Sequence, residues 1–204
     1  MKRVVIFFIG ASLLIGYLFA GQSTPNDSKF LKEAVFDKVP PFFIKIKTEF
    51  LDIATTSTFD DWDTAKTLGP ITQLKCWHGD VFNNIKAVYS MASLPVHPSN
   101  SSLPQNTITI PADDPLIKVS GFYGSYFGAT HITRVVFTLR SGKKFGPYGT
   151  GNNMTGLQRF KLGNRKEDGQ LYTIGAFFGG SYLHSDSSEF LSKLGIYRRL
   201  MLIS

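Results

Sequence analysis

The chain has 204 residues, of which 43% are hydrophobic, 14% aromatic and 18% charged, with 19 Gly, 10 Pro and a single Cys. This composition is enough for one packed domain with appendages, and it excludes a coiled coil, a collagen, a wholly disordered chain and a multi-span membrane protein. One cysteine also excludes a disulfide framework within the chain. The formal net charge of +7 weakly favours an acidic partner.

The N-terminal segment predicts export from the cytosol. Two basic residues precede an uncharged run over residues 4–20, and a polar stretch follows it. Residues 1–21 are therefore interpreted as a secretory signal peptide, cleaved after the small residue Ala20 or Gly21. Because the run is long for a signal and just long enough for a spanning helix, an uncleaved membrane anchor through residues 4–20 is the alternative. Both interpretations predict a secreted or extracellular protein, or one anchored in a membrane of the secretory pathway.

Three acceptor sequons for N-linked glycans agree with this location. They begin at Asn26, Asn100 and Asn153. Sequons of this kind are modified in the secretory pathway, where they lie on exposed segments. The sequence therefore predicts a glycoprotein.

The rest of the chain divides into an extension over 22–59 and an all-β domain over 60–204. The extension has no regular period, and Pro40 and Pro41 interrupt any continuous helix. From Gly69 onward, short alternating apolar and polar runs separated by turn residues indicate antiparallel strands. The expected strands cover residues 73–77, 84–89, 107–110, 116–126, 131–140, 170–178 and 190–199, with a hairpin turn at 78–80 and a Gly- and Ser-rich loop before the last strand.

Four motifs in this domain resemble the jacalin-related lectins, and within them the animal branch typified by zymogen granule secretory lectins. They are Gly-Pro-Ile-Thr-Gln-Leu at 69–74, Ile-Lys-Val-Ser-Gly-Phe-Tyr-Gly at 117–124, the hairpin over 132–150 that ends in Gly-Pro-Tyr-Gly-Thr, and Leu-Gly-Ile-Tyr at 194–197. Their order and approximate spacing follow the family. The resemblance implies a β-prism of three four-stranded antiparallel sheets over about residues 60–204.

The resemblance also implies non-enzymatic, metal-independent carbohydrate binding at one apex of the prism, where three loops converge. A sugar is held there by backbone amides of Gly-rich loops, by a carboxylate and by an aromatic ring. The family pattern has a Gly-Gly loop before the first long strand and Gly-x-x-x-Asp before the last. Here the Asp position falls on Ser192, the Gly position falls on Ser188, and residues 59–64 contain no glycine.

A displaced carboxylate is the alternative alignment. The loop would then begin at Gly179, Gly180 and Ser181, and an insertion would place Asp186 or Glu189 at the site. A third loop, the basic hairpin of Ser141, Gly142, Lys143 and Lys144, would favour sulfated, sialylated or phosphorylated glycans. Neutral monosaccharides are expected to bind poorly because Ser192 replaces a carboxylate. The predicted carbohydrate-binding residues are Ser141, Gly142, Lys143, Lys144, Gly179, Gly180, Ser181, Asp186, Glu189 and Ser192.

The remaining polar and aromatic groups give weaker signals. His78 with Asp80, and His184 with Asp186, are interpreted as turn chemistry because no third ligand or nucleophile accompanies either pair. Cys76 is expected to be a buried small hydrophobe. The aromatic cluster at 123, 126 and 127 is a candidate stacking surface, but core packing is the preferred interpretation.

Two classes of function follow from these patterns. The first is a lectin whose partners are glycans or glycoproteins, and the second is a β-prism that has lost its sugar site and serves as an interaction or structural module. No catalytic residue, metal site, cofactor or nucleic-acid motif is predicted, and an oligomer is possible.

Overall fold

The structure is a computed structural model that describes residues 5–9, 12–16, 43–46, 54–98, 106–163 and 172–200. It has two compact units, residues 1–40 and 41–204. In the first unit, β1 (Val5–Ile9) and β2 (Ser12–Gly16) pair as an antiparallel hairpin. No helix among the described residues is both long and apolar enough to cross a membrane. Cleavage or anchoring of residues 1–21 stays a prediction.

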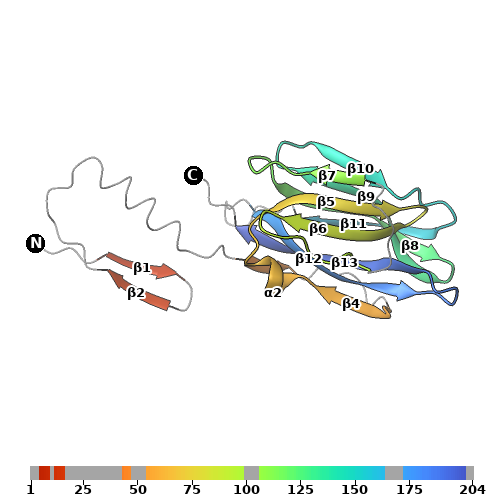
Figure 1. Cartoon of the computed structure of the whole chain (residues 1–204), viewed down its shortest axis with the longest axis horizontal. Coiled ribbons are helices and arrows are strands. Elements are labelled where there is room, and N and C mark those ends of the chain that lie inside the picture. The colour runs from red at the N-terminus through yellow and green to blue at the C-terminus, as the bar shows by residue number, and fades with distance from the viewer. Residues whose placement is uncertain are drawn as a thin grey trace, which may run out of the picture. The chain divides into compact units, whose positions relative to one another are not determined.

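The second unit contains three antiparallel sheets (Figure 1). The first has the order β10-β9-β8-β11, with β8 (Leu116–Tyr126), β9 (Ala129–Leu139), β10 (Lys144–Tyr148) and β11 (Thr155–Gly163). The second has the order β3-β13-β12-β4, with β3 (Phe43–Ile46), β4 (Ser57–Asp60), β12 (Tyr172–Leu183) and β13 (Glu189–Leu200). The third has the order β6-β5-β7, with β5 (Ile71–His78), β6 (Phe82–Tyr89) and β7 (Asn106–Thr109). A single turn of helix, α2 (Trp62–Ala65), connects β4 to β5.

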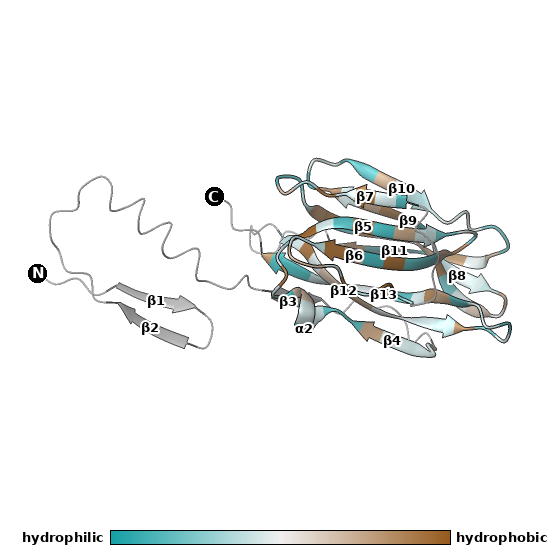
Figure 2. Cartoon of the chain, viewed as in Figure 1, coloured by the Kyte–Doolittle hydropathy of each residue, from teal (hydrophilic) through white to brown (hydrophobic). Residues whose placement is uncertain are grey.

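The three sheets enclose one hydrophobic core, to which each contributes its inner face. Hydrophobic and hydrophilic residues alternate along the strands, as Figure 2 shows for β5 and β6, and the hydrophobic ones form this core. In β11, Phe160 and Leu162 are buried, whereas Arg159 and Lys161 are exposed. The largest fully buried side chains come from all three sheets and include Phe82, Leu74, Phe137, Ile132, Phe177, Leu194 and Tyr197. This arrangement confirms the predicted β-prism.

Several details differ from the sequence-based expectation. The third sheet has three strands, and the segment after β6 extends its edge only through isolated bridges at Ser93 and His97. The β5–β6 hairpin forms as predicted, with Cys76 fully buried in β5. Strand β11 was not predicted. Strands β3 and β4 begin before residue 60 and pair with β13 and β12.

The Gly-rich segment before the last strand is not a loop. Gly179, Gly180 and Ser181 lie inside β12 and pair with both β13 and β4. A Cβ atom on Gly179 would lie 2.0 Å from the carbonyl oxygen of Lys193 in β13. These glycines therefore permit close strand packing, and the prediction that they form a binding loop was wrong.

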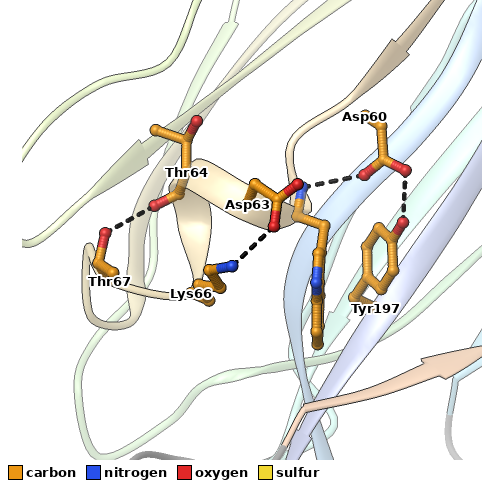
Figure 3. Close-up of polar contacts among 7 residues, drawn as sticks. Asp60, Asp63, Thr64, Lys66, Thr67 and Tyr197 are labelled. Carbon is orange, nitrogen blue, oxygen red and sulfur yellow. Dashed lines mark hydrogen bonds and ion pairs between the residues drawn. The ribbon is translucent and has the colours of Figure 1, made fainter.

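The acidic segment at 59–64 is also structural. Figure 3 shows the Asp60 carboxylate accepting hydrogen bonds from the backbone N–H of Trp62 at 3.0 Å and from the hydroxyl of Tyr197 at 2.6 Å. The neighbouring Asp61 is buried and contacts Nε2 of His97 at 2.9 Å. These carboxylates join β4 and α2 to the core. The segment therefore does not form the sugar-binding loop that the lectin pattern has before its first long strand.

Replacement of Gly179 by alanine tests the close packing of β12 against β13. We expect G179A to lower the free energy of unfolding by about 1–3 kcal/mol, because its Cβ overlaps a backbone carbonyl. The control is G79A, since a Cβ on Gly79 meets nothing within 4 Å. Urea unfolding measures both, and equal stabilities for the two variants would contradict the assigned packing.

Candidate functional site

Three segments of the chain meet at one end of the prism, which we call the apex. They are the β8–β9 turn (126–129), the β12–β13 turn (184–188) and residues 55–57 at the start of β4. The Thr56 N–H donates to the carbonyl of Ser181 at 2.8 Å, and the Leu183 N–H donates to Oγ1 of Thr56 at 2.9 Å. The rings of Tyr126 and Phe190 approach edge to face at 6.3 Å and connect the two turns.

A pair of histidines lies beneath the apex. His131, near the start of β9, and His184 place their Nε2 atoms 2.8 Å apart. His131 is fully buried, and its Nδ1 lies 3.1 Å from the hydroxyl of Ser192. Burial, with the nearby His184 as a smaller cause, lowers the pKa of His131 from 6.5 to about 4, although a backbone hydrogen bond with Leu191 opposes the shift. His131 is therefore neutral at physiological pH.

This arrangement prevents Ser192 from contacting a ligand at the surface. Its side chain is fully buried, and its hydroxyl is engaged with His131. Sequence analysis placed Ser192 among the sugar-contacting residues, and the structure places it below the surface instead.

Two carboxylates lie at the apex. Oε1 of Glu189 accepts hydrogen bonds from the hydroxyls of Ser57, at 2.9 Å, and of Ser181. Asp186 is exposed in the β12–β13 turn and accepts from the backbone N–H and the hydroxyl of Ser188. Those two bonds, the side-chain bond first, lower the pKa of Asp186. Asp186 is therefore a solvent-facing anion, whereas Glu189 holds β4 to β12.

Exposed hydrophobic side chains also gather at the apex. Phe127 is 77% exposed at the tip of the β8–β9 turn, and Leu183 is 48% exposed at the end of β12. Backbone φ values of +46° at Phe127 and +80° at Gly128 form a tight turn that directs the phenyl ring outward. Its edge contact with Tyr126, at 4.5 Å, orients the ring. The preferred prediction of core packing was therefore wrong for Phe127.

The basic hairpin lies at the other end of the prism. The Arg140 N–H donates to the carbonyl of Pro115, and the Ser141 N–H donates to Asp114, so this turn borders the start of β8. The 11-residue strand β9 separates it from the apex by about 30 Å. Ser141, Gly142, Lys143 and Lys144 therefore do not lie beside Asp186 and Glu189, contrary to the prediction.

The apex thus combines groups that suit a carbohydrate. A carboxylate such as that of Asp186 accepts hydrogen bonds from adjacent sugar hydroxyls, and an exposed ring such as that of Phe127 covers an apolar sugar face. No three His, Cys, Asp or Glu side chains in the described parts of the chain cluster as metal ligands. Sequence reasoning missed the contribution of Thr56 and the histidine pair, since neither motif nor spacing brings these distant residues together.

The sequence matches the jacalin-like lectin domain over residues 55–197. The chain belongs to the jacalin-like lectin family. A sequence comparison with curated proteins found no significant match. Membership of this lectin family confirms the resemblance of the four motifs, and assignment to the animal branch stays a prediction.

Several solved lectin structures share this fold. A mannose-specific jacalin-related lectin from Morus nigra, in complex with mannose, is 20% identical with a TM-score of 0.51, over 78% of this chain and 100% of that chain. The mannose-binding lectin from champedak is 18% identical with a TM-score of 0.54, over 80% and 99%. Frutapin from Artocarpus incisa is 16% identical with a TM-score of 0.55, also over 80% and 99%. At these identities the comparison shows a shared fold.

The buried histidine predicts a pH-dependent stability. The folded pKa of His131 lies below its unfolded value of 6.5, so only the unfolded chain takes up the proton between these values. The neutral His131 stabilises the fold fully above about pH 6.5. As the pH falls towards 4, the free energy of unfolding decreases by about 2–3 kcal/mol. We expect the stability advantage of wild type over H131N to shrink across this range in urea unfolding. Parallel pH profiles for the two proteins would contradict the assignment.

Proposed function

We propose that this jacalin-like domain binds carbohydrate at the apex. One observation carries the proposal: an exposed carboxylate, Asp186, and an exposed aromatic ring, Phe127, are presented by two neighbouring turns of a lectin fold. In this site Asp186 accepts hydrogen bonds from vicinal hydroxyls, while Phe127 contacts the apolar face of the sugar ring. Asp186 thus supplies the carboxylate that Ser192 lacks.

The charges at the apex favour a neutral glycan. Asp186 is anionic, Glu189 is a second carboxylate, and His131 beneath them is neutral. A sulfate or sialic acid would be repelled by these groups. The anionic preference predicted for this site depended on Lys143 and Lys144, which lie beside the far end of β9. Two solved structures with this fold support a neutral ligand for this site. The Morus nigra lectin is in complex with mannose, and the lectin MPA is in complex with the T-antigen disaccharide.

Apex variants test the binding proposal. We expect F127A and D186N each to weaken the affinity for a neutral glycan by about tenfold, which corresponds to the loss of one ring contact or one charge-assisted hydrogen bond. The ligands are a mannose oligosaccharide and the T-antigen disaccharide, measured by isothermal titration calorimetry. M91A is the control because Met91 is 75% exposed and lies outside the apex.

The alternative function is a β-prism module without sugar binding. A wild-type protein that binds no member of an array of neutral and anionic glycans would favour this alternative. Binding that is equally strong in F127A, D186N and M91A would show that the glycan occupies another surface.

We also propose that the protein enters the secretory pathway. The basic start and apolar run of the N-terminal segment support this proposal, together with the three sequons. Asn26 and Asn100 lie outside the described residues. Asn153 is exposed in the connection between β10 and β11, and its side-chain amide donates to Asp80 at 3.1 Å.

Expression in eukaryotic cells tests this route. We expect peptide N-glycosidase to lower the apparent mass of the protein, and we expect N153Q to remove part of that shift because the Asn153 sequon is accessible. A cytosolic protein whose mass does not change would contradict the proposal.

A further inference from the structure

A hydrogen-bonded pair of histidines joins the β12–β13 turn to the interior of the prism. His184 is the first residue of this turn, and its Nε2 lies 2.8 Å from Nε2 of His131, which is fully buried in β9. On the other side of the His131 ring, Nδ1 lies 3.1 Å from the hydroxyl of Ser192 in β13. Both nitrogens of His131 are engaged, so its ring is a fixed anchor for the His184 side chain.

His184 also closes the turn through its backbone. Its N–H donates to the carbonyl of Ser188 at 2.8 Å, and its carbonyl accepts from the N–H of Ser187 at 3.0 Å. Asp186 lies within this short loop, and its Oδ1 accepts both the backbone and the hydroxyl bond from Ser188. The direction of the Asp186 carboxylate therefore depends on the turn that His184 closes.

Aromatic rings surround the two imidazoles. Tyr126 from β8 meets the His131 ring edge to face at 6.1 Å, and Tyr182 from β12 meets the His184 ring at 5.1 Å. Phe190 from β13 lies 5.7 Å from both imidazole rings. These rings offer little hydration to a charge on the buried His131, so the folded protein favours the neutral form of this residue.

The charged groups near the pair lie on the turn and on neighbouring strands. After its bonds within the turn, the nearby His184 is a further cause that lowers the pKa of Asp186. Glu189 at the start of β13 is bonded to hydroxyls of β4 and β12. Burial, and then the charge of Asp80, raises the pKa of Tyr126. Among the described residues, none of these carboxylates hydrogen-bonds to the buried imidazole, so a proton on that ring gains no acidic partner.

Protonation of both histidines is incompatible with the pair. At 2.8 Å one hydrogen lies between the two Nε2 atoms, so one ring donates and the other accepts. Two charged imidazoles would instead place two N–H donors and two like charges against each other. An open turn exposes His131 to water, so its pKa returns from about 4 towards 6.5. Acid therefore favours the open turn between these two values, because the open form binds more protons.

We propose that His184, anchored on His131, is a positioning residue for Asp186 and makes glycan binding at the apex reversible by acid. At neutral pH the pair holds the turn closed and the carboxylate directed towards the sugar hydroxyls. In acid the pair separates, the turn opens and the carboxylate loses its fixed direction. Although this inference rests on the proposed glycan site, closure of the turn is measurable without a ligand.

Amide hydrogen exchange of the ligand-free protein tests the positioning role at about pH 7 and about pH 4.5. In wild type we expect the protection factors of amides 184, 187 and 188 to fall by about tenfold at the lower pH. We expect H184A to lack this protection at both pH values. H184Q is expected to keep it at both, because the glutamine amide donates to neutral His131 or accepts from charged His131. The matched control is H78A, since His78 bonds to Asn106 outside the pair, and it should behave as wild type.

Calorimetric titration with a neutral mannose oligosaccharide tests the effect on binding. This ligand does not titrate, and the pKa of Asp186 is lowered, so a loss of affinity in acid reports the turn. We expect the wild-type affinity to fall by about tenfold between the two pH values. H184A is expected to be about tenfold weaker at neutral pH, whereas H184Q should bind as wild type there and lose less affinity in acid.

The exchange data also separate local opening from global unfolding, with the amides of β8 as an internal reference. The proposal would be overturned by equal turn protection in wild type at the two pH values, or by loss of β8 protection together with the turn. Full turn protection in H184A, or the same losses in H78A as in H184A, would also overturn it. A wild type that binds no glycan would contradict the proposed function, whereas the exchange experiment would still decide whether the histidine pair closes the turn.

Discussion

Close packing between β12 and β13 is the constraint on which the apex of the prism depends. Gly179 faces Leu194, and Gly195 faces Phe178, in one long antiparallel ladder. A side chain on Gly179 would overlap the carbonyl of Lys193, and one on Gly195 would overlap the Phe178 ring. Since the ladder continues to the pair of Leu183 and Glu189, it holds the turn at 184–188 beside β8 and β9. The glycines therefore position the apex from within the sheet.

The apex and the basic hairpin lie at opposite ends of the prism. The apex offers Asp186 and an exposed phenyl ring, groups that suit hydroxyl groups and apolar sugar faces. Lys144 pairs with Thr138 near the far end of β9, so it lies far from Asp186.

Much of the fold could be predicted from the sequence, whereas much of the site could not. Alternation predicted the β5–β6 hairpin, and four motifs predicted the prism. Gly179 and Gly180 suggested a loop because glycine usually marks turns, but close strand packing requires them here. Strand β11 escaped detection because its alternation is confined to residues 159–162, and a bulge between Thr155 and Gln158 precedes them. Sequence alone also does not show which end of β9 faces the β12–β13 turn, so the basic hairpin was placed at the wrong end.

A backbone amide chemical-shift titration tests the central claim most directly. The claim is that a glycan occupies the apex formed by the β8–β9 and β12–β13 turns. With a neutral mannose oligosaccharide as ligand, the account predicts shifts concentrated at residues 126–131 and 183–192, and unchanged signals at 140–148. Shifts centred on 140–148, or no shifts at any ligand concentration for the whole panel of neutral glycans, would contradict it.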